Sequence, residues 1–391
     1  MIAWLLLFVV FPVVMGIAVV VFEAWAGFLL PESVDSDRRE PGPIAVLVPA
    51  HDEAGGIADT VRSLREQLRA VDRLMVIADN CTDDTAALAR EAGAEVIERQ
   101  HASERGKGYA LAFGIERLAE RPPDILIVVD ADCEVVSGAL RTIARQAEVT
   151  SCPAQAVYLM DPSHRAGLKT RISVLAFLFK NLVRARGLAR LGLPTQLTGT
   201  GMAFPWAVVK LVPWASGDLV EDMELGLNLA GQGHAPMLCE AALVTSPAAG
   251  SDDAGATQRT RWEHGHLNTL LKRAPGLIVR GLLSGRPSLV VMGIDLAVPP
   301  LAMLCMGWVA ALLLSLLVWA ITGEGESAST LLLVWGFLLG LTVVVAVIRD
   351  GAGRVRLMDL LAVPGYVLWK IPVYVKYVVA RQTAWVRTER D

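Results

Sequence analysis

Residues 125–132 read Ile-Leu-Ile-Val-Val-Asp-Ala-Asp, an apolar run that ends in two carboxylates two positions apart. Five consecutive apolar residues between polar segments are typical of a strand buried on both faces. The strand would end just before Asp130, so that Asp130 and Asp132 begin the loop that follows. Two such carboxylates can hold one hard cation, because Mg²⁺ prefers oxygen ligands and is commonly bound by one or two carboxylates plus substrate phosphates. Acidic pairs are also common on solvated loops, so the wider pattern has to decide.

Strand-like and helix-like segments alternate around this run. Apolar runs predict strands at 44–48, 74–78, 94–97 and 125–129, and apolar residues at helical spacing predict helices at 57–68, 83–91 and 107–119. This order predicts an α/β domain with a mostly parallel sheet covered by helices. In such sheets, ligands bind beyond the carboxyl ends of the strands, where His51-Asp52-Glu53, Asp79-Asn80 and Asp130 fall. The chain has no G-x-G-x-x-G or Walker pattern, which argues against a dinucleotide-binding or P-loop fold.

The composition favours a membrane protein in a reducing compartment. Of the 391 residues, 53% are apolar, and the excess is concentrated at the two ends of the chain. The net charge of −4 gives no sign of a nucleic-acid partner. The five cysteines are scattered without a C-x-x-C pair, which argues against a disulfide framework and against a zinc site.

Residues 1–32 are predicted to form an N-terminal transmembrane helix. The stretch 2–30 is apolar apart from Glu23 and is long enough to span a bilayer. A cleaved signal peptide is the alternative, but no basic residue precedes the run, and the run is longer than the apolar core of a signal. Arg38 and Arg39 follow it, so the positive-inside rule places residue 40 onward, and with it a predicted domain at 40–285, in the cytoplasm.

Further membrane segments are predicted nearer the C-terminus. Two transmembrane helices fall within 288–349, near 296–321 and 330–348, and the connection between them lacks Lys and Arg and should face outside. Segment 350–391 interleaves aromatic and basic residues, which predicts an interfacial amphipathic segment, with a fourth span as the alternative. Residues 165–191 interleave basic with apolar residues, which fits either a helix on the inner leaflet or an ordinary surface helix.

Two polar loops of the predicted sheet suit a nucleotide ligand. Arg105-Gly106-Lys107-Gly108 opens a helix, and a helix N-terminus with a lysine favours phosphate, although the same pattern fits a flexible turn. Asp79-Asn80 follows a strand, where a carboxylate can accept hydrogen bonds from a base or ribose. Helix capping is the alternative role for that second loop.

Two downstream motifs complete the set. Glu221-Asp222 begins a predicted helix, where a carboxylate can act as general base on an acceptor hydroxyl or simply offset the helix dipole. The small-residue loop 198–201 lies between the two acidic motifs and can admit an acceptor or form a simple turn. In Gln258-Arg259-Thr260-Arg261-Trp262, the guanidinium of Arg261 suits phosphate, and Trp262 can stack on a sugar or base or anchor a helix at the membrane surface.

In order along residues 43–270, these motifs resemble the membrane-embedded glycosyltransferases of family 2. That group includes cellulose, hyaluronan and chitin-oligosaccharide synthases and ceramide glucosyltransferase. The resemblance rests on the ordered set Pro49-Ala50-His51-Asp52-Glu53, Asp79-Asn80, Arg105-Gly106-Lys107-Gly108, Asp130-Ala131-Asp132, Glu221-Asp222 and Gln258-x-x-Arg261-Trp262. It departs from the polymer synthases at Val220, where they commonly carry Thr, and in having only about three visible spans.

The resemblance implies a GT-A fold and an inverting single displacement from a nucleotide-diphospho-sugar, usually a UDP-sugar. It implies that Asp130 and Asp132 hold UDP and Mg²⁺ or Mn²⁺, and that Asp222, with Glu221 beside it, is the catalytic base. Nucleotide-sugar contacts are implied for Pro49, Glu53, Asp79 and Lys107, and Gln258, Arg261 and Trp262 would close over the diphosphate and the acceptor sugar.

The resemblance leaves three hypotheses for function. The first is an inner-membrane transferase that moves sugar from a UDP-sugar to a lipid-linked or growing-saccharide acceptor in exopolysaccharide or glycolipid synthesis. It would act alone, as a homo-oligomer or beside a polysaccharide exporter. The second is a ceramide-type glucosyltransferase that adds one sugar. The third is a non-catalytic scaffold subunit of an export complex, which the presence of both metal carboxylates and the base speaks against.

Overall fold

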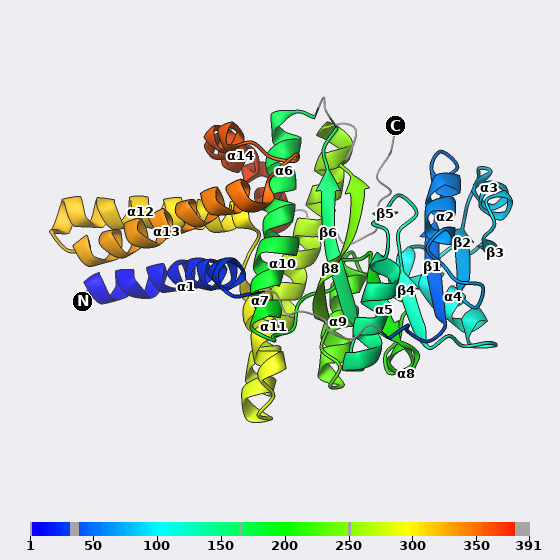
Figure 1. The fold of residues 1–391 in the computed structure, drawn as a ribbon. Coiled ribbons are helices and arrows are strands. Elements are labelled where there is room, and N and C mark those ends of the chain that lie inside the picture. The colour runs from blue at the N-terminus through cyan, green and yellow to red at the C-terminus, as the bar shows by residue number, and fades with distance from the viewer. Residues whose placement is uncertain (1, 32–38, 164–165, 249–251, 380–391) are drawn as a thin grey trace. The chain divides into compact units, whose positions relative to one another are not determined.

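A computed structural model describes residues 2–31, 39–163, 166–248 and 252–379 (Figure 1). The described chain divides into a sheet unit, residues 39–163 and 192–248, and a helical unit, residues 2–31, 166–191 and 252–379. Arg38, used in the topology prediction, and residues 380–391 of the predicted interfacial segment lie outside the described residues.

The sheet unit holds an eight-stranded mixed sheet in the order β3-β2-β1-β4-β7-β6-β8-β5. Its strands are β1 Ile44–Ala50, β2 Arg73–Asp79, β3 Glu95–Arg99, β4 Ile125–Val128, β5 Glu134–Val135, β6 Ala154–Asp161, β7 Met202–Pro205 and β8 Met237–Pro247. Strands β1 to β4 are parallel, and so are β6 and β8, whereas β7 runs antiparallel to both β4 and β6, and β5 antiparallel to β8. The predicted mostly parallel α/β sheet is confirmed in the first half and gains an antiparallel insertion in the second.

Helices cover this sheet and account for its apolar strands. They are α2 Ile57–Arg65, α3 Thr85–Glu91, α4 Lys107–Leu118, α5 Ala139–Thr150, α8 Trp206–Val209 and α9 Glu221–Gly231. Residues of α4, α8 and α9 form one buried cluster with β1, β2, β4 and β7. All four residues of β4 are fully buried, as expected for a strand packed on both faces.

The parallel strands place three polar loops at one edge of the sheet. In the register of the sheet, Ala50 at the end of β1 pairs with Ala78 of β2, and Leu47 pairs with Val128 at the end of β4. The loops after β1, β2 and β4 therefore leave the sheet on the same side. This edge is where ligands bind in parallel α/β sheets.

The helical unit contains the long apolar helices. Its elements are α1 Ile2–Leu29, α6 Leu168–Leu178, the π-helix η1 Phe179–Arg184, α7 Ala185–Arg190, α10 Asp252–Leu283, α11 Pro287–Ala297, α12 Leu301–Thr322, α13 Glu326–Asp350, the 3₁₀ helix η2 Leu357–Ala362, α14 Val363–Trp369 and α15 Ile371–Val379. Helices α1, α12 and α13 lie side by side (Figure 1) and share an apolar cluster that includes Val10, Ala311 and Leu332.

Four stretches are long and apolar enough to cross a membrane: Leu6–Leu29, Leu301–Thr322, Glu326–Asp350 and Leu357–Val379. The first three match the predicted spans, although α12 begins at Leu301 because Pro299-Pro300 separates it from α11. The fourth is broken into η2, α14 and α15, of which the longest has nine residues. Nine helical residues are about 14 Å long, against the ~30 Å of a bilayer core.

The basic residues of segment 165–191 are engaged inside the helical unit. Arg184 donates to Glu23 at 2.6 Å and to Asp295 at 2.6 Å, and it is almost fully buried. Arg186 pairs with Asp350 at 2.9 Å, and Arg190 donates to the carbonyl oxygens of Gly27 and Leu30. The bonds of Arg186 and Arg190 hold α7 against α13 and α1. Placement of the whole segment on a leaflet stays a prediction.

Candidate active site

Asp130 and Asp132 lie directly after β4 at the ligand edge of the sheet. Both are half-buried, and their carboxylate oxygens and the Cys133 Sγ atom lie within 4.8 Å of one another. The backbone N–H of Asp130 donates to the Thr200 Oγ1 atom at 3.0 Å, which fixes the start of the loop. The sequence prediction that these two carboxylates converge is consistent with this geometry.

The donor set fits a hard divalent cation. Two carboxylates supply the oxygen ligands that Mg²⁺ and Mn²⁺ prefer. Burial, together with the neighbouring carboxylates of Asp132 and Asp130, raises the pKa of the Cys133 thiol well above its usual value. Hard divalent cations prefer oxygen to sulfur ligands, so the carboxylates are the groups that would hold the ion.

Lys107, the first residue of α4, reaches the same place. Its ammonium forms an ion pair with Asp130 and donates to the Gly199 carbonyl oxygen at 2.7 Å. Burial opposes the charged form of Lys107, but the carboxylates of Asp130, Glu221 and Asp222 outweigh it, and the pKa of Lys107 is raised. The lysine is therefore a fixed positive charge among the acidic groups.

Gly106 and Gly108 flank this lysine for different reasons. Gly106 precedes α4 with a φ of +120°, a conformation that favours glycine. A Cβ on Gly108 would lie 2.6 Å from the Ser216 carbonyl oxygen. Close packing against the protein's own backbone, rather than against a ligand, thus explains Gly108.

Glu221 and Asp222 open α9 as the sequence predicted. The Asp222 Oδ1 atom accepts from the Met223 N–H at 2.8 Å. Gly199 has a φ of +96°, and a Cβ placed on it would lie 3.3 Å from the Asp222 Oδ2 atom and 3.6 Å from the Lys107 Nζ atom. The predicted metal carboxylates and the predicted base therefore meet around Lys107 and Gly199.

The surroundings of Glu221 disfavour its charged form. Burial and the charge of Asp222 raise the pKa of Glu221 to about 7, and Lys107 only partly offsets them. Glu221 is therefore partly protonated at neutral pH.

Two residues that the sequence reading missed hold the loop 198–201 in place. Gln155 of β6 is buried and donates to the Thr200 carbonyl oxygen at 2.9 Å, while its Oε1 atom accepts from the Thr198 N–H at 2.9 Å. Thr200 is fully buried and receives the Asp130 N–H. An isolated Gln in a strand and a Thr between glycines have no spacing signature that could have revealed this role.

The loops after β1 and β2 form the neighbouring part of the edge. The Asp79 Oδ1 atom accepts from Arg99 at 2.8 Å and from the Asn80 side chain at 3.1 Å. The Asp79 carbonyl oxygen lies 2.7 Å from the His51 Nδ1 atom. The predicted nucleotide residue Asp79 is therefore also half of a buried ion pair with Arg99, a partner that the sequence did not indicate.

Pro49 and Glu53, the other predicted contacts at this edge, flank the same turn. Pro49 lies within β1, paired with Ile77. The backbone N–H of Glu53 donates to Thr85 at 2.8 Å.

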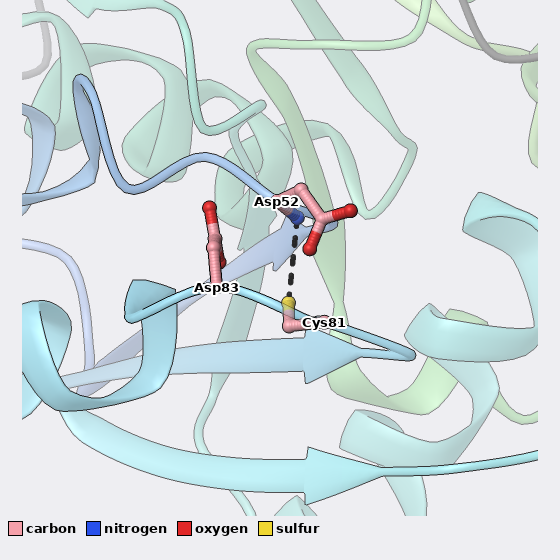
Figure 2. A group of neighbouring side chains, drawn as sticks. All are labelled: Asp52, Cys81 and Asp83. Carbon is pink, nitrogen blue, oxygen red and sulfur yellow. Dashed lines mark hydrogen bonds between the residues drawn. The ribbon is translucent and has the colours of Figure 1, made fainter.

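Figure 2 shows a second acidic group at this edge, formed by Asp52, Cys81 and Asp83. The Asp52 carboxylate accepts from the Thr82 N–H at 2.6 Å, and Asp83 accepts from the Ala54 N–H at 3.0 Å. The Asp52 N–H points at the Cys81 sulfur, 3.5 Å away (Figure 2). These bonds give the carboxylates a structural role in shaping two loops.

Gln258, Arg261 and Trp262 lie on α10, in the helical unit. Their i, i+3, i+4 spacing puts them on one face of the helix. The Trp262 ring lies 5.7 Å from the Phe177 ring of α6. Nearby, His264 and His266 approach the carbonyl oxygens of Val373 and Val298 at 3.0 and 3.1 Å, which gives each ring a structural partner.

Comparison with known proteins agrees with this picture. A hexosyltransferase of low-salt glycan biosynthesis from Haloferax volcanii is 35% identical over 103 residues, which cover 26% of this chain and 23% of that protein. A probable glycosyltransferase of Bacillus subtilis is 24% identical over 247 residues, which cover 60% of this chain and 58% of that protein. The chain thus spans less than two thirds of the length of either relative.

A solved mannosyltransferase of Pyrobaculum calidifontis, in complex with GDP-Man and Mn²⁺, shares the fold. Its TM-score is 0.58 at 15% identity, and the match covers 96% of this chain and all of that one. The family model described as "Glycosyltransferase like family 2" matches residues 41–265, more than half of the chain. The protein therefore belongs to glycosyltransferase family 2.

Proposed function

We propose that this protein is an inverting, membrane-bound glycosyltransferase that moves a sugar from a UDP-sugar to a lipid-linked or saccharide acceptor. The observation that carries the proposal is that the predicted metal carboxylates and the predicted base lie close together around Lys107. Asp130 and Asp132 can hold a donor metal, Lys107 pairs with Asp130, and a Cβ on Gly199 would lie 3.3 Å from the Asp222 Oδ2 atom and 3.6 Å from the Lys107 Nζ atom.

Each group has a distinct task in this reaction. A bound Mg²⁺ or Mn²⁺ would neutralise the charge that develops on the leaving diphosphate. Lys107, held in its charged form, would offer the diphosphate a further positive charge. Asp222 would take the proton from the acceptor hydroxyl as that oxygen bonds to the anomeric carbon and the bond to the diphosphate breaks.

The remaining predicted residues belong to substrate binding. Pro49, Glu53 and Asp79 would line the nucleotide, with Arg99 holding the Asp79 carboxylate in position. Gln258, Arg261 and Trp262 would close over the diphosphate and the acceptor sugar, as the resemblance to the membrane-embedded synthases implies. Glu221, whose pKa is raised to about 7, would be partly protonated beside the base and so limit the negative charge there.

For the membrane arrangement, we propose three crossing helices, α1, α12 and α13, and a C-terminal segment at the interface. The broken geometry of η2, α14 and α15 supports this count, because none of them is long enough to cross alone. Charge placement supports a cytoplasmic sheet unit at the inner membrane. So few spans favour a lipid-linked or short saccharide acceptor over a polymer channel built by one chain.

Two variants test the division of roles. Asp222→Asn should abolish transfer, a loss of at least about 10³-fold in kcat, while UDP affinity measured by calorimetry stays within about twofold, since only the base is lost. Asp132→Ala should instead lose metal-dependent UDP binding. Loss of UDP binding in Asp222→Asn, or equal UDP affinity of Asp132→Ala in Mn²⁺ and in EDTA, would contradict the assignments.

A further inference from the structure

The C-terminal segment, formed by η2, α14 and α15, contacts the part of α10 that carries Gln258, Arg261 and Trp262. Lys370, between α14 and α15, is 1% exposed and forms an ion pair with Glu263 of α10. One residue further along α10, the His264 Nε2 atom lies 3.0 Å from the Val373 carbonyl oxygen. These contacts fall on the two residues that follow Trp262 in the chain.

Aromatic side chains of the same segment also contact α10. The Arg259 guanidinium lies 5.5 Å from the Trp369 ring, and the His264 ring lies 5.2 Å from the Tyr377 ring. At 100° per residue, the side chains of Arg259 and Glu263 leave α10 on a different face from Gln258, Arg261 and Trp262. The C-terminal segment therefore holds the helix while leaving the motif face to other partners.

The segment also binds α6, the helix against which Trp262 packs. Asp359 accepts from Arg171 at 3.1 Å, and the Tyr366 hydroxyl lies 2.9 Å from the Ser173 hydroxyl. Trp369 receives the Lys169 ammonium at 4.7 Å on the same ring that Arg259 approaches. One short segment thus ties the helix bearing the motif to the helix bearing Phe177.

A buried ion pair at this point is not explained by stability. Removing both charges from water costs more than packing apolar side chains of similar volume, and replacing such pairs by apolar groups is often neutral or stabilising. What a buried pair adds is one defined arrangement, because each charge must face the other.

We propose that Glu263 and Lys370 are positioning residues for the reaction: their ion pair sets the orientation in which α10 presents Gln258, Arg261 and Trp262. The inference rests on the proposed function. It assigns the C-terminal segment a part in turnover in addition to its place at the membrane.

The test compares the double variant Glu263→Gln/Lys370→Met with wild type in the full-length protein. Expected are a kcat at least 10-fold lower, an unchanged affinity for UDP with Mn²⁺, and a melting temperature within about 3 °C of wild type. Hydrogen exchange of the backbone amides in residues 255–266 should also become faster. A folded double variant with the kcat and acceptor KM of wild type would overturn the proposal.

Two further variants keep the test decisive. Arg186→Met/Asp350→Asn removes another buried ion pair of the helical unit, between α7 and α13, and should leave kcat within about twofold. If the double variant does not fold, the variant Lys370→Arg tests the proposal instead. It keeps the positive charge at position 370 but changes the geometry of the ion pair with Glu263. Its kcat should fall severalfold, and a wild-type kcat would overturn the proposal. If wild type transfers no sugar, the proposed function fails. Hydrogen exchange in α10 then still tests whether the Glu263–Lys370 ion pair orders this helix.

Discussion

Glu221 and Asp222 are neighbours in sequence, and the proposed function gives their carboxyl groups different tasks. Two carboxylates so close cannot both ionise without cost, and burial adds to the cost for Glu221. A pKa of about 7 leaves Glu221 partly protonated at neutral pH, and the proposed function assigns the role of base to Asp222.

The raised pKa of Glu221 predicts a specific pH dependence of stability. A carboxyl whose folded pKa lies above its unfolded value favours folding at low pH, and this contribution is lost as pH rises from about 4.5 through about 7. The slope is at most about 1.4 kcal/mol per pH unit. Glu221→Gln removes the dependence, so its melting temperature relative to wild type should rise between pH 5 and pH 8.

The measurement is thermal unfolding of both proteins in EDTA across that range. Glu134→Gln, at an exposed glutamate of β5, is the matched control and should show no such trend. A difference between Glu221→Gln and wild type that is flat from pH 5 to pH 8 would contradict the assigned shift.

At the residue scale, the sequence could predict the charged groups of the site but not the residues that hold them in position through hydrogen bonds and ion pairs. Asp130, Asp132, Lys107 and Asp222 were identifiable because each stands where a strand or loop gives way to the next element. Gln155 and Thr200 were not, because their role depends on strands β6 and β7 meeting in space. The Arg99 partner of Asp79 depends on strand pairing in the same way.

At the scale of elements, the crossing of α1 and α7 depends on glycine. A Cβ on Gly187 would lie 1.7 Å from the Glu23 carbonyl oxygen, and one on Gly27 would lie 3.0 Å from the Gly187 nitrogen. The two backbones therefore touch directly. This contact brings Arg184 within reach of Glu23 and so gives a buried charge its partner.

Gly187→Ala should accordingly destabilise the helical unit. The methyl group would force α1 and α7 apart, at a cost of about 1–3 kcal/mol or more, and disturb the Arg184–Glu23 pair. Gly340→Ala is the matched control, since nothing lies within 4 Å of a Cβ at that position in α13. There alanine should be neutral or stabilising by about 0.5–1 kcal/mol. Equal melting temperatures for the two variants would contradict the close crossing.

Element prediction succeeded where the apolar pattern is regular. The strands from β1 to β4 were predicted from continuous apolar runs and the helices between them from apolar residues at helical spacing, and the predicted bounds differ from the observed ones by only a few residues. Strand β5 has only two residues, too few to show a pattern.

At the scale of the whole molecule, the proposal joins a nucleotide-sugar unit to three crossing helices. In a background without the native cysteines, a cysteine placed by Glu324→Cys, between α12 and α13, should react with a membrane-impermeant maleimide in intact cells. One placed by His234→Cys, in the sheet unit, should react only after permeabilisation. Labelling at position 234 in intact cells would contradict the orientation.

The central claim is metal-dependent sugar transfer, and nucleotide release tests it most directly. The full-length protein, purified in detergent, would be given a panel of UDP- and GDP-sugars with and without Mn²⁺, and with membrane lipid extract as acceptor. We predict release from one UDP-sugar that requires Mn²⁺, increases with lipid and disappears in Asp222→Asn. No release from any donor by the folded protein would contradict the account.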